Sequence, residues 1–348
     1  MKTHEFYMKR CIELAKNGLG TTYPNPLVGS VIVHNGKIIG EGWHKKAGEP
    51  HAEVNAVNSV KDKSLLKEAT IYVSLEPCSH FGKTPPCCDL IIANKIPNVV
   101  IGTIDSFAKV AGNGIKKLVE SGKNVTIGIL EDECNELNKR FFTFHQKKRP
   151  YVILKWAETA DGFIAPISKT EKSPVWITNS YSRQLVHKWR TEEQAILVGT
   201  NTVLEDNPKL DARDFKGNNP IRIVWDKSNK ITEEFHIKNE RIPTFFLTEI
   251  KNLTEKQNIC YKNTIFDTLL AKRTLDILYK ENIQSVIVEG GSQTLQTFIV
   301  ANLWDEARVF VSETNFNVGI IAPKLPKSRI LTSLLLEKDQ LKLFRNYD

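Results

Sequence analysis

Four residues of this chain have the types and spacing of a metal site with an adjacent acid. His51 and Glu53 stand two residues apart, and Cys78 and Cys87 follow behind a strand-like run. A neutral imidazole and two thiolates are ligands that Zn²⁺ prefers, and three protein ligands leave a fourth position open for water. Zinc-bound water ionises near neutral pH, so hydroxide becomes available as a nucleophile. Glu53 is not needed as a ligand, and its carboxylate can pass a proton from that water to a leaving ammonia.

The order of these residues is typical of zinc deaminases, whose signature is H-x-E followed by P-C and a second cysteine. The alternative for the same residues is a closed structural zinc site, with Cys88 or His80 as its fourth ligand, or buried free cysteines beside a surface acid. Adjacent cysteines rarely reach one metal together, and the sequence therefore favours a catalytic zinc site.

The surroundings of the predicted metal site contain further polar residues. Eight residues separate the two cysteines, where the short C-x-x-C form has two, and the spacer holds His80 and Lys83. Upstream, Gly42-Trp43-His44 adds another imidazole, and Asn25 stands between two prolines that restrict its backbone. Each of these is an ordinary loop residue when taken alone.

Together, PNPLVG, GWHKKAGEPHAE and PCSHFGKTPPC make the first half resemble the deaminase half of the bifunctional riboflavin-biosynthesis enzymes. Those enzymes deaminate a diaminopyrimidinone ribosylamino 5′-phosphate and then reduce its ribose to a ribityl chain. The resemblance implies that His44, His80 and Lys83 meet the substrate phosphate and that Asn25 meets the substrate. Cationic and imidazole donors suit a phosphate dianion.

The second half carries a softer set of polar residues at predicted strand and helix ends. Ser285–Val288 reads as a strand that runs into Glu289-Gly290-Gly291-Ser292 and a helix, an arrangement whose free N–H groups can hold an anion. A tight strand-to-helix turn with no ligand is the plain alternative for this Gly-Gly pair. The chain has no G-x-G-x-x-G, which argues against a standard Rossmann site.

As an ensemble, these segments resemble the reductase half of the same enzymes, whose fold is similar to dihydrofolate reductase. The resemblance covers about residues 5–311 and implies NADPH as cofactor. We expect Lys155 to polarise or protonate the opening ribosylamine, and a strand-end lysine in solvent is the plain alternative. It implies cofactor contacts from Ala157, Trp176, Thr202, Asp206, Gly291, Ser292, Thr294 and Thr297. It implies substrate contacts from Thr178, Arg190, Leu210, Arg213 and Glu289, and two arginines suit a phosphate because guanidinium can bind it bidentately.

The sequence departs from the family pattern at three places. Two lie in segments expected to bind the reductase substrate, and one lies next to a predicted zinc ligand. Thr159-Ala160 replaces the usual Ser-Leu before Asp-Gly, and Pro174 stands where a serine is expected, with Ser173 one residue earlier. Cys88 adjoins a ligand cysteine where the family commonly has a non-thiol residue.

Composition places the chain among globular proteins of two domains. It has 348 residues, 41% hydrophobic and 25% charged, with no apolar run of membrane-spanning length. Six cysteines show no disulfide framework, which predicts a reducing, cytoplasmic setting. The lysines behind the net charge of +8 are scattered, so we expect an anionic small molecule and cofactor rather than nucleic acid. We expect no membrane partner. We expect the protein to form a homo-oligomer, whose size the sequence does not specify.

The elements that position the site follow from alternating strand and helix patterns. Asn35-Gly36 predicts a hairpin between residues 28–33 and 37–41, and helices are expected at 6–17, 51–59, 86–94 and 114–121. Strands are expected at 69–74, 98–103 and 124–129, and a connecting helix at 134–144. Residues 1–146 are thus predicted to form a cytidine-deaminase-like three-layer α/β/α domain, and 150–348 a dihydrofolate-reductase-like α/β domain.

The predicted function is therefore a zinc deaminase, with one Zn²⁺ per chain, joined to an NADPH-dependent reductase. One alternative is a deaminase of cytidine or nucleic acid whose second domain is an accessory without reductase activity. The other is a binding protein that zinc merely stabilises. The Lys83-bearing spacer and the polar ensemble of the second half favour the bifunctional enzyme.

Overall fold

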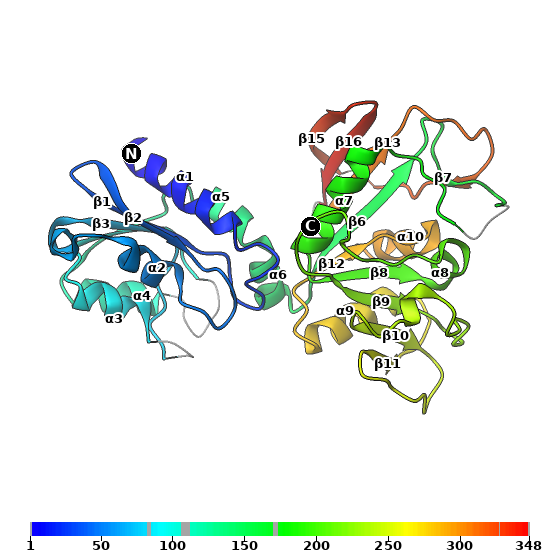
Figure 1. The fold of residues 1–348 in the computed structure, drawn as a ribbon, viewed down its shortest axis with the longest axis horizontal. Helices are drawn as coiled ribbons and strands as arrows, with labels where there is room; N and C mark the ends of the chain where they lie inside the picture. The colour runs from blue at the N-terminus through cyan, green and yellow to red at the C-terminus, as the bar shows by residue number, and fades with distance from the viewer. Residues whose placement is uncertain (1, 82–84, 106–111, 170–172, 327, 347–348) are drawn as a thin grey trace. The chain divides into compact units, whose positions relative to one another are not determined.

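The computed structural model describes residues 2–81, 85–105, 112–169, 173–326 and 328–346. The chain divides into two compact units, Met1–Lys148 and Arg149–Asp348. Each is built on one main sheet (Figure 1) and is described by itself. Among the described residues, the helices are all too short or too polar to cross a membrane.

The N-terminal unit has a five-stranded sheet in the order β2-β1-β3-β4-β5. The hairpin predicted at Asn35-Gly36 is confirmed, since His34 pairs with Lys37 and both turn residues have positive φ. β1 runs antiparallel to both β2 and β3, whereas β3, β4 and β5 are parallel. The strands are β1 (Gly29–His34), β2 (Lys37–Trp43), β3 (Thr70–Leu75), β4 (Asn98–Thr103) and β5 (Asn124–Ile127).

Helices cover both faces of this sheet, which gives the predicted three layers (Figure 1). Alternate residues of one strand point to opposite faces. Val31 therefore packs with the first and fifth helices, and its neighbour Ile32 packs with the second, third and fourth. The helices are α1 (Lys2–Lys16), α2 (Ala52–Ser59), the 3₁₀ helix η1 (Lys63–Glu68), α3 (Cys87–Ala93), α4 (Asn113–Glu120), α5 (Glu131–Leu137) and α6 (Lys139–Lys147).

The single connecting helix predicted at residues 134–144 is wrong, because two helices, α5 and α6, meet at Asn138. The buried Asn138 side chain accepts from the Leu27 N–H at 2.8 Å and donates to the Leu27 carbonyl at 2.9 Å. An amide that satisfies a distant backbone residue in this way holds the helix break in place, and no local pattern shows such a partner.

The C-terminal unit has a nine-stranded sheet in the order β11-β10-β9-β8-β12-β6-β13-β16-β15. The strands from β11 to β13 are parallel, and β16 and β15 are antiparallel additions at one edge. The strands of this sheet are β6 (Tyr151–Glu158), β8 (Ala195–Gly199), β9 (Ile221–Trp225), β10 (Thr244–Thr248), β11 (Ile259–Asn263), β12 (Ser285–Val288), β13 (Glu306–Val311), β15 (Arg329–Leu336) and β16 (Asp339–Arg345). Two further strands, β7 (Phe163–Ala165) and β14 (Ile320–Ile321), pair antiparallel with each other. The helices are α7 (Ser180–Glu192), α8 (Thr200–Asp206), η2 (His236–Lys238), α9 (Leu270–Lys280) and α10 (Ser292–Val300).

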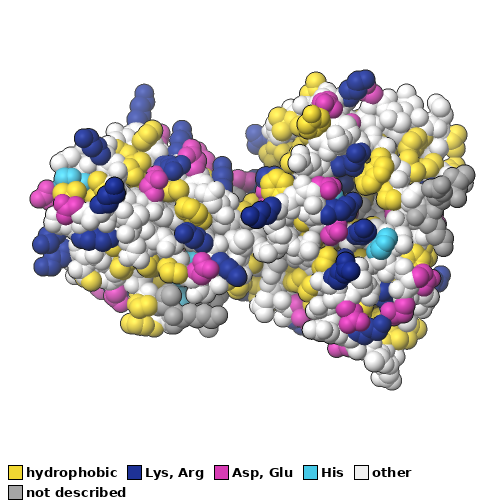
Figure 2. Space-filling model, in the orientation of Figure 1, with side chains coloured by type: hydrophobic (Ala, Val, Ile, Leu, Met, Phe, Trp, Pro, Cys, Tyr) yellow, Lys and Arg dark blue, Asp and Glu magenta, His cyan; other side chains and the backbone are white. Residues whose placement is uncertain are grey.

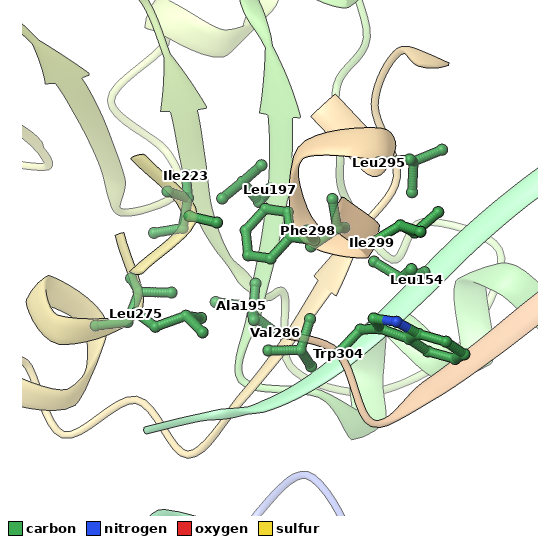
Figure 3. Close-up of a cluster of buried hydrophobic side chains, with 14 of the residues drawn as sticks. Leu154, Ala195, Leu197, Ile223, Leu275, Val286, Leu295, Phe298, Ile299 and Trp304 are labelled. Atoms are coloured by element: carbon green, nitrogen blue, oxygen red, sulfur yellow. The ribbon is translucent and has the colours of Figure 1, made fainter. Parts of the chain in front are cut away.

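The largest core of this unit lies between the central strands and helices α9 and α10 (Figure 3). Phe298 from α10 stacks on Trp225 from β9 at a ring distance of 5.5 Å. Leu154, Leu197 and other strand residues pack in the same core as these helices. This core fixes α10, and with it the turn before the helix, against the carboxyl ends of the strands.

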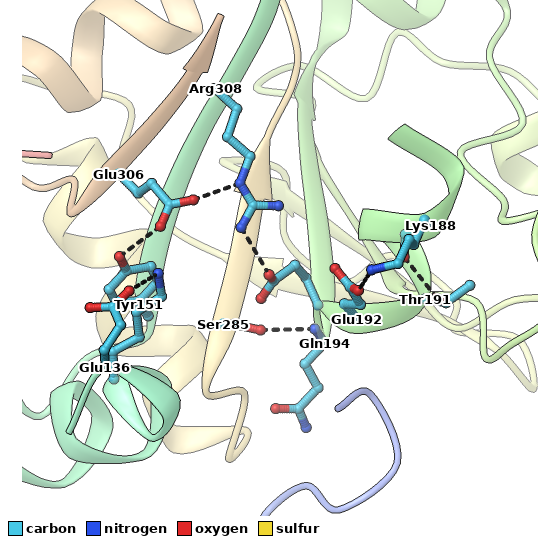
Figure 4. Close-up of polar contacts among 11 residues, drawn as sticks. Glu136, Tyr151, Lys188, Thr191, Glu192, Gln194, Ser285, Glu306 and Arg308 are labelled. Atoms are coloured by element: carbon cyan, nitrogen blue, oxygen red, sulfur yellow. Dashed lines mark hydrogen bonds and ion pairs between the residues drawn. The ribbon is translucent and has the colours of Figure 1, made fainter. Parts of the chain in front are cut away.

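A buried polar cluster ties β13 to the end of α7 (Figure 4). Arg308 donates to Glu306 at 2.6 Å and to Glu193 at 3.5 Å, and its guanidinium lies 4.6 Å from the Trp189 ring centre. The Tyr151 hydroxyl donates to Glu306 at 3.1 Å. Because buried charges need partners, this cluster constrains the alignment of α7, β6 and β13. Those elements carry Arg190 and Lys155.

Candidate functional site

His51, Cys78 and Cys87 converge at the ends of three different elements. His51 caps the N-terminus of α2, Cys87 is the first residue of α3, and Cys78 lies on the loop after β3. His51 Nδ1 is 3.4 Å from the Cys87 sulfur and 3.6 Å from the Cys78 sulfur. The three ligand atoms lie within 4.8 Å of one another. Two sulfurs and one imidazole nitrogen at this spacing fit a zinc ion.

The electrostatics of the two cysteines favour one thiolate even before a metal binds. A hydrogen bond from Cys87 lowers the pKa of Cys78, and His51 adds to the effect. The Cys87 backbone N–H also donates to the Cys78 sulfur at 3.3 Å. The N-terminus of a helix favours a thiolate over a thiol in general, and Cys87 N–H is such a group.

Glu53 lies beside this cluster on the first turn of α2 and is 3% exposed. Burial and the negative charge of Cys78 raise the pKa of Glu53 to about 7. A carboxyl group whose pKa lies near neutrality both accepts and donates a proton at working pH, which suits a proton shuttle.

Glu76 is a buried residue that the sequence analysis missed, two positions before Cys78. Its carboxylate accepts from the backbone N–H groups of Asp105 at 3.3 Å and Gly112 at 3.0 Å through one oxygen. The other oxygen accepts from Gly114 at 2.8 Å and Ile115 at 3.3 Å. Glu76 therefore joins the end of β3 to the first turn of α4 and fixes the start of the cysteine loop.

Cys88 is not aimed at the metal cluster. Its buried thiol donates to the Pro77 carbonyl at 3.2 Å and to the Gly114 carbonyl at 3.5 Å. Gly114 lies so close that an added Cβ would meet the Pro77 oxygen at 2.1 Å. Cys88 thus packs against the same loop that Glu76 anchors, and its contacts are those of a residue that stabilises the loop.

The residues predicted to contact the deaminase substrate fall into two groups. Asn25 and His44 lie next to the metal cluster, with Asn25 Nδ2 3.0 Å from His44 Nε2 and the His44 ring 5.3 Å from the His51 ring. Burial lowers the pKa of His44 below its usual value. His80 is exposed on the cysteine loop, and Lys83 lies outside the described residues.

In the C-terminal unit, strand register brings a second polar group together. Val288 of β12 pairs with Leu154 of β6 on one side and Leu197 of β8 on the other. Glu289, the next residue, therefore lies beside Lys155. These are carboxyl ends of adjacent parallel strands, where ligands of open α/β sheets bind.

Glu289 forms a buried ion pair with Arg190 of α7, at 2.8 Å. Burial alone would raise the pKa of Glu289, but Arg190 and Lys155 outweigh it and lower that pKa to about 2. Burial lowers the pKa of Lys155 below its ordinary value, and Glu289 opposes that shift. The three side chains form a charged group with one anion and two cations.

Arg213 and His187 lie against the same segment as Arg190. The Asp211 carbonyl accepts from Arg190 at 3.0 Å and lies 3.0 Å from His187 Nδ1. Arg213 pairs with the Asp211 carboxylate at 2.5 Å, and its side chain is 41% exposed. Burial and the two arginines lower the pKa of His187.

The turn before α10 depends on two glycines. Gly291 has φ +69°, which side chains rarely adopt, and an added Cβ would meet Thr202 Oγ1 at 3.4 Å. Gly290 is tighter, because a Cβ there would lie 2.7 Å from Val198. These two glycines let the chain turn tightly from β12 into α10, at a place where no larger residue would fit without strain.

A cavity of about 730 Å³ joins these groups at the carboxyl ends of the strands. Asp206, expected to contact the cofactor, lies in it and forms an ion pair with Lys169. Thr294 and Thr297 do not line it, and the Thr297 hydroxyl instead donates to the Gln293 carbonyl at 2.8 Å. The predicted residues that line it are Lys155, Ala157, Trp176, Thr178, Arg190, Thr202, Asp206, Leu210, Arg213, Glu289, Gly291 and Ser292.

Comparison with known proteins covers both units. Residues 1–103 match the family model of the cytidine and deoxycytidylate deaminase zinc-binding region, and residues 150–314 match that of the RibD C-terminal domain. The chain is 40% identical to riboflavin biosynthesis protein RibD of Aquifex aeolicus over 344 residues, which cover 96% of this chain and 94% of the relative. It is 37% identical to RibD of Escherichia coli K12, covering 88% of this chain and 87% of the relative.

Solved structures agree with these matches over the full length. A diaminohydroxyphosphoribosylaminopyrimidine deaminase/5-amino-6-(5-phosphoribosylamino)uracil reductase from Thermotoga maritima superposes with a TM-score of 0.90 at 38% identity and covers 99% of both chains. Acinetobacter baumannii RibD, form 1, gives a TM-score of 0.88 at 30% identity and covers 100% of this chain and 99% of its own.

Proposed function

This chain belongs to the RibD family of riboflavin-biosynthesis enzymes, and from that premise we propose which of its residues carry each reaction. It is a bifunctional enzyme with a zinc-binding deaminase domain and a reductase domain. The alternative of a cytidine or nucleic-acid deaminase with an accessory domain is not favoured, because the relatives match through both units. The substrate that we propose is 2,5-diamino-6-(5-phosphoribosylamino)pyrimidin-4-one.

In the deaminase, we assign one Zn²⁺ per chain to His51, Cys78 and Cys87. When bound, zinc makes hydroxide available at neutral pH. Glu53 takes the proton of the attacking water and delivers it to the amino group that leaves as ammonia. Its buried position beside the ligands, on the first turn of α2, lets one carboxyl group serve both transfers.

The substrate is oriented by the side chains on either side of this centre. Asn25 and His44, held together by their hydrogen bond, contact the pyrimidinone and its ribose phosphate. His80 and Lys83 are proposed to contact the phosphate from the cysteine loop. His80 is exposed, which leaves its imidazole free to reach a ligand.

In the reductase, we propose NADPH as the nicotinamide cofactor, because the carried-over contacts and the Gly291–Ser292 turn suit its phosphates. The cofactor supplies the hydride for C1′ of the ring-opened ribose. Gly291 and Ser292 offer backbone N–H groups to the pyrophosphate, and Ala157, Trp176, Thr202 and Asp206 flank it. Thr294 and Thr297 are proposed to act through the helix that begins at this turn.

We propose that the two arginines have different tasks rather than forming one symmetrical clamp. Arg190 is buried with Glu289, so releasing it would leave a buried carboxylate unpaired. Arg213 is half exposed, and an exposed ion pair such as that with Asp211 contributes little. Arg213 is therefore the residue that turns to the ribose 5-phosphate, with Thr178 and Leu210 beside it. Arg190 and Glu289 hold Lys155 at the reacting ribosylamine.

Kinetics of the full-length enzyme test this division. Arg213→Ala should raise KM for the deaminated substrate with little change in kcat, whereas Lys155→Met should lower kcat. Ammonia release by the deaminase should be unchanged in both variants, since these residues lie in the other unit. Equal effects of Arg213→Ala on phosphorylated and dephosphorylated substrate would refute its role at the phosphate.

We also propose that the protein self-associates through β15. This edge strand exposes apolar side chains on both faces, and Leu335 is 75% exposed. Figure 2 shows hydrophobic side chains gathered over the β15–β16 hairpin. An apolar edge strand with free backbone groups usually pairs or is covered, and a second copy would do both. All six cysteines are free thiols, and the cytoplasmic location predicted from them stays a prediction.

A further inference from the structure

The C-terminal unit contains a second cavity, of about 690 Å³, next to the cavity of the proposed reductase site. Gly217 and Asn219 precede β9, and Arg241 and Ile242 precede β10, so the cavity lies at the amino ends of these parallel strands. The proposed reductase site lies at the carboxyl ends. The residues that line the second cavity include Lys209, Asp211, Arg213, Arg222, Asn239 and Arg241.

The lining is strongly basic. It holds four Lys or Arg residues, Lys209, Arg213, Arg222 and Arg241, against one acid, Asp211. The Asp211 carboxylate is already paired with Arg213. Lys209 and Arg241 are exposed at the rim, where they can attract an anion from solution.

Arg222 is the residue that distinguishes this cavity from a solvated basic surface. It is 1% exposed, and its Nη1 donates to the neutral Asn239 oxygen at 3.1 Å. Its Nε has no hydrogen-bond partner among the described residues, and Asp211, the acid of the lining, pairs with Arg213 instead. Burial lowers the pKa of Arg222 to about 10. A buried guanidinium with an unpaired N–H is costly unless a ligand satisfies it.

We propose that this cavity is a binding site for a phosphate dianion, with Arg222 at its floor and Arg241 and Lys209 at its rim. Guanidinium groups match the tetrahedral oxygens of phosphate, which explains why arginine prevails over lysine here. Asn219 and Asn239 add neutral groups to the wall. This site adjoins the ribose 5-phosphate contact proposed above and shares Arg213 with its cavity, whereas Arg222 and Arg241 line the second cavity alone.

The wall between the two cavities gives the site a consequence for the reductase. Asp211 accepts from Arg190 through its carbonyl, whereas the next N–H, of Ala212, donates to Asn219 at 2.9 Å. Lys209, Arg213 and His236 line both cavities. An anion in the second cavity draws Arg213 away from the first, so phosphate should raise KM for the reductase substrate and leave deamination unchanged.

Calorimetric titration of the full-length protein with inorganic phosphate, with NADPH present, tests the site. Wild type should bind phosphate saturably. Arg241→Ala, which removes a rim residue outside the proposed active site, should weaken phosphate binding about fivefold or more, as expected for loss of one partly screened charged contact. Lys272→Ala removes an exposed charge on α9 and should match wild type. Arg222→Gln should abolish binding.

Two results would overturn the proposal. One is the absence of saturable phosphate binding by wild type. The other is phosphate affinity that Arg241→Ala leaves unchanged but Arg190→Ala weakens, since this would place the ion in the first cavity. Because Arg222 is buried, Arg222→Gln counts only if its thermal midpoint and NADPH affinity are those of wild type. If Arg222→Gln does not fold, the phosphate affinity of Arg241→Ala decides whether the site exists.

Discussion

Replacing Glu76 by glutamine should weaken the deaminase unit although Glu76 touches neither substrate nor metal. Glutamine has nearly the same shape, but one of its two terminal groups is a donor. Either orientation of the amide turns that donor toward two backbone N–H groups. One orientation disrupts the bonds to Asp105 and Gly112, and the other disrupts those to Gly114 and Ile115.

The magnitude follows from these two pairs. Each pair contains one bond of 3.0 Å or less and one of 3.3 Å, so the two orientations cost similar amounts. Leaving a buried N–H unsatisfied costs about 1–3 kcal/mol. Loss of a negative charge at the N-terminus of α4 adds about 0.3–1 kcal/mol. Two unsatisfied N–H groups and the lost charge together cost about 2–7 kcal/mol. At about 2–4 °C per kcal/mol for a unit of this size, even the lower end lowers the thermal midpoint by about 5 °C.

The two activities of the enzyme serve as separate probes of the two units. Samples of Glu76→Gln are heated, and residual deaminase and reductase activities are measured on the same aliquots. The deaminase midpoint should fall and the reductase midpoint should not, and a chelator should remove zinc faster than from wild type. Glu120→Gln, an exposed acid on the same helix, is the matched control. A deaminase midpoint and zinc release equal to those of the control would refute the anchoring role.

Glu53→Gln should keep zinc and lose about 10²–10⁴-fold in deamination, because it removes a proton carrier and no ligand; zinc content and ammonia release check this, and loss of the metal would contradict it. Glu289→Gln should cost about 3–5 kcal/mol at neutral pH by leaving buried cations unpaired. Because its folded-state pKa is about 2 against an ordinary 4.5, the carboxylate stabilises the fold above about pH 4.5, and this is lost as pH falls toward 2. The free energy of unfolding, measured with urea at several pH values in this range, should therefore change less with pH in the variant than in wild type. The same pH dependence in both proteins would contradict the assignment. Gly291→Val should weaken NADPH binding in a fluorescence titration without affecting deamination, since the backbone there has positive φ and faces the cavity.

The grouping of His51, Cys78 and Cys87 was predictable because three residue types that bind zinc stand at short spacing in the sequence. His51 and Glu53 share one helix turn, and the cysteines flank one loop, so few folds could separate them. Glu76 was not predictable in the same way. Its partners are backbone N–H groups 29 to 39 residues further along, and backbone groups carry no sequence signal. The break at Asn138 was missed for the same reason, since its partner Leu27 is 111 residues away.

The reductase site shows a different limit of sequence reasoning. Glu289, Arg190 and Lys155 were each singled out, but their pairing depends on the strand order β8-β12-β6, which the alternation of elements does not specify. That order turns three scattered residues into one charged group with a single shared anion. It also decides how the two arginines differ: one is locked by a buried carboxylate, and the other is held by an exposed one. The electrostatic roles of this site are therefore set by topology, whereas those of the zinc site are set by local spacing.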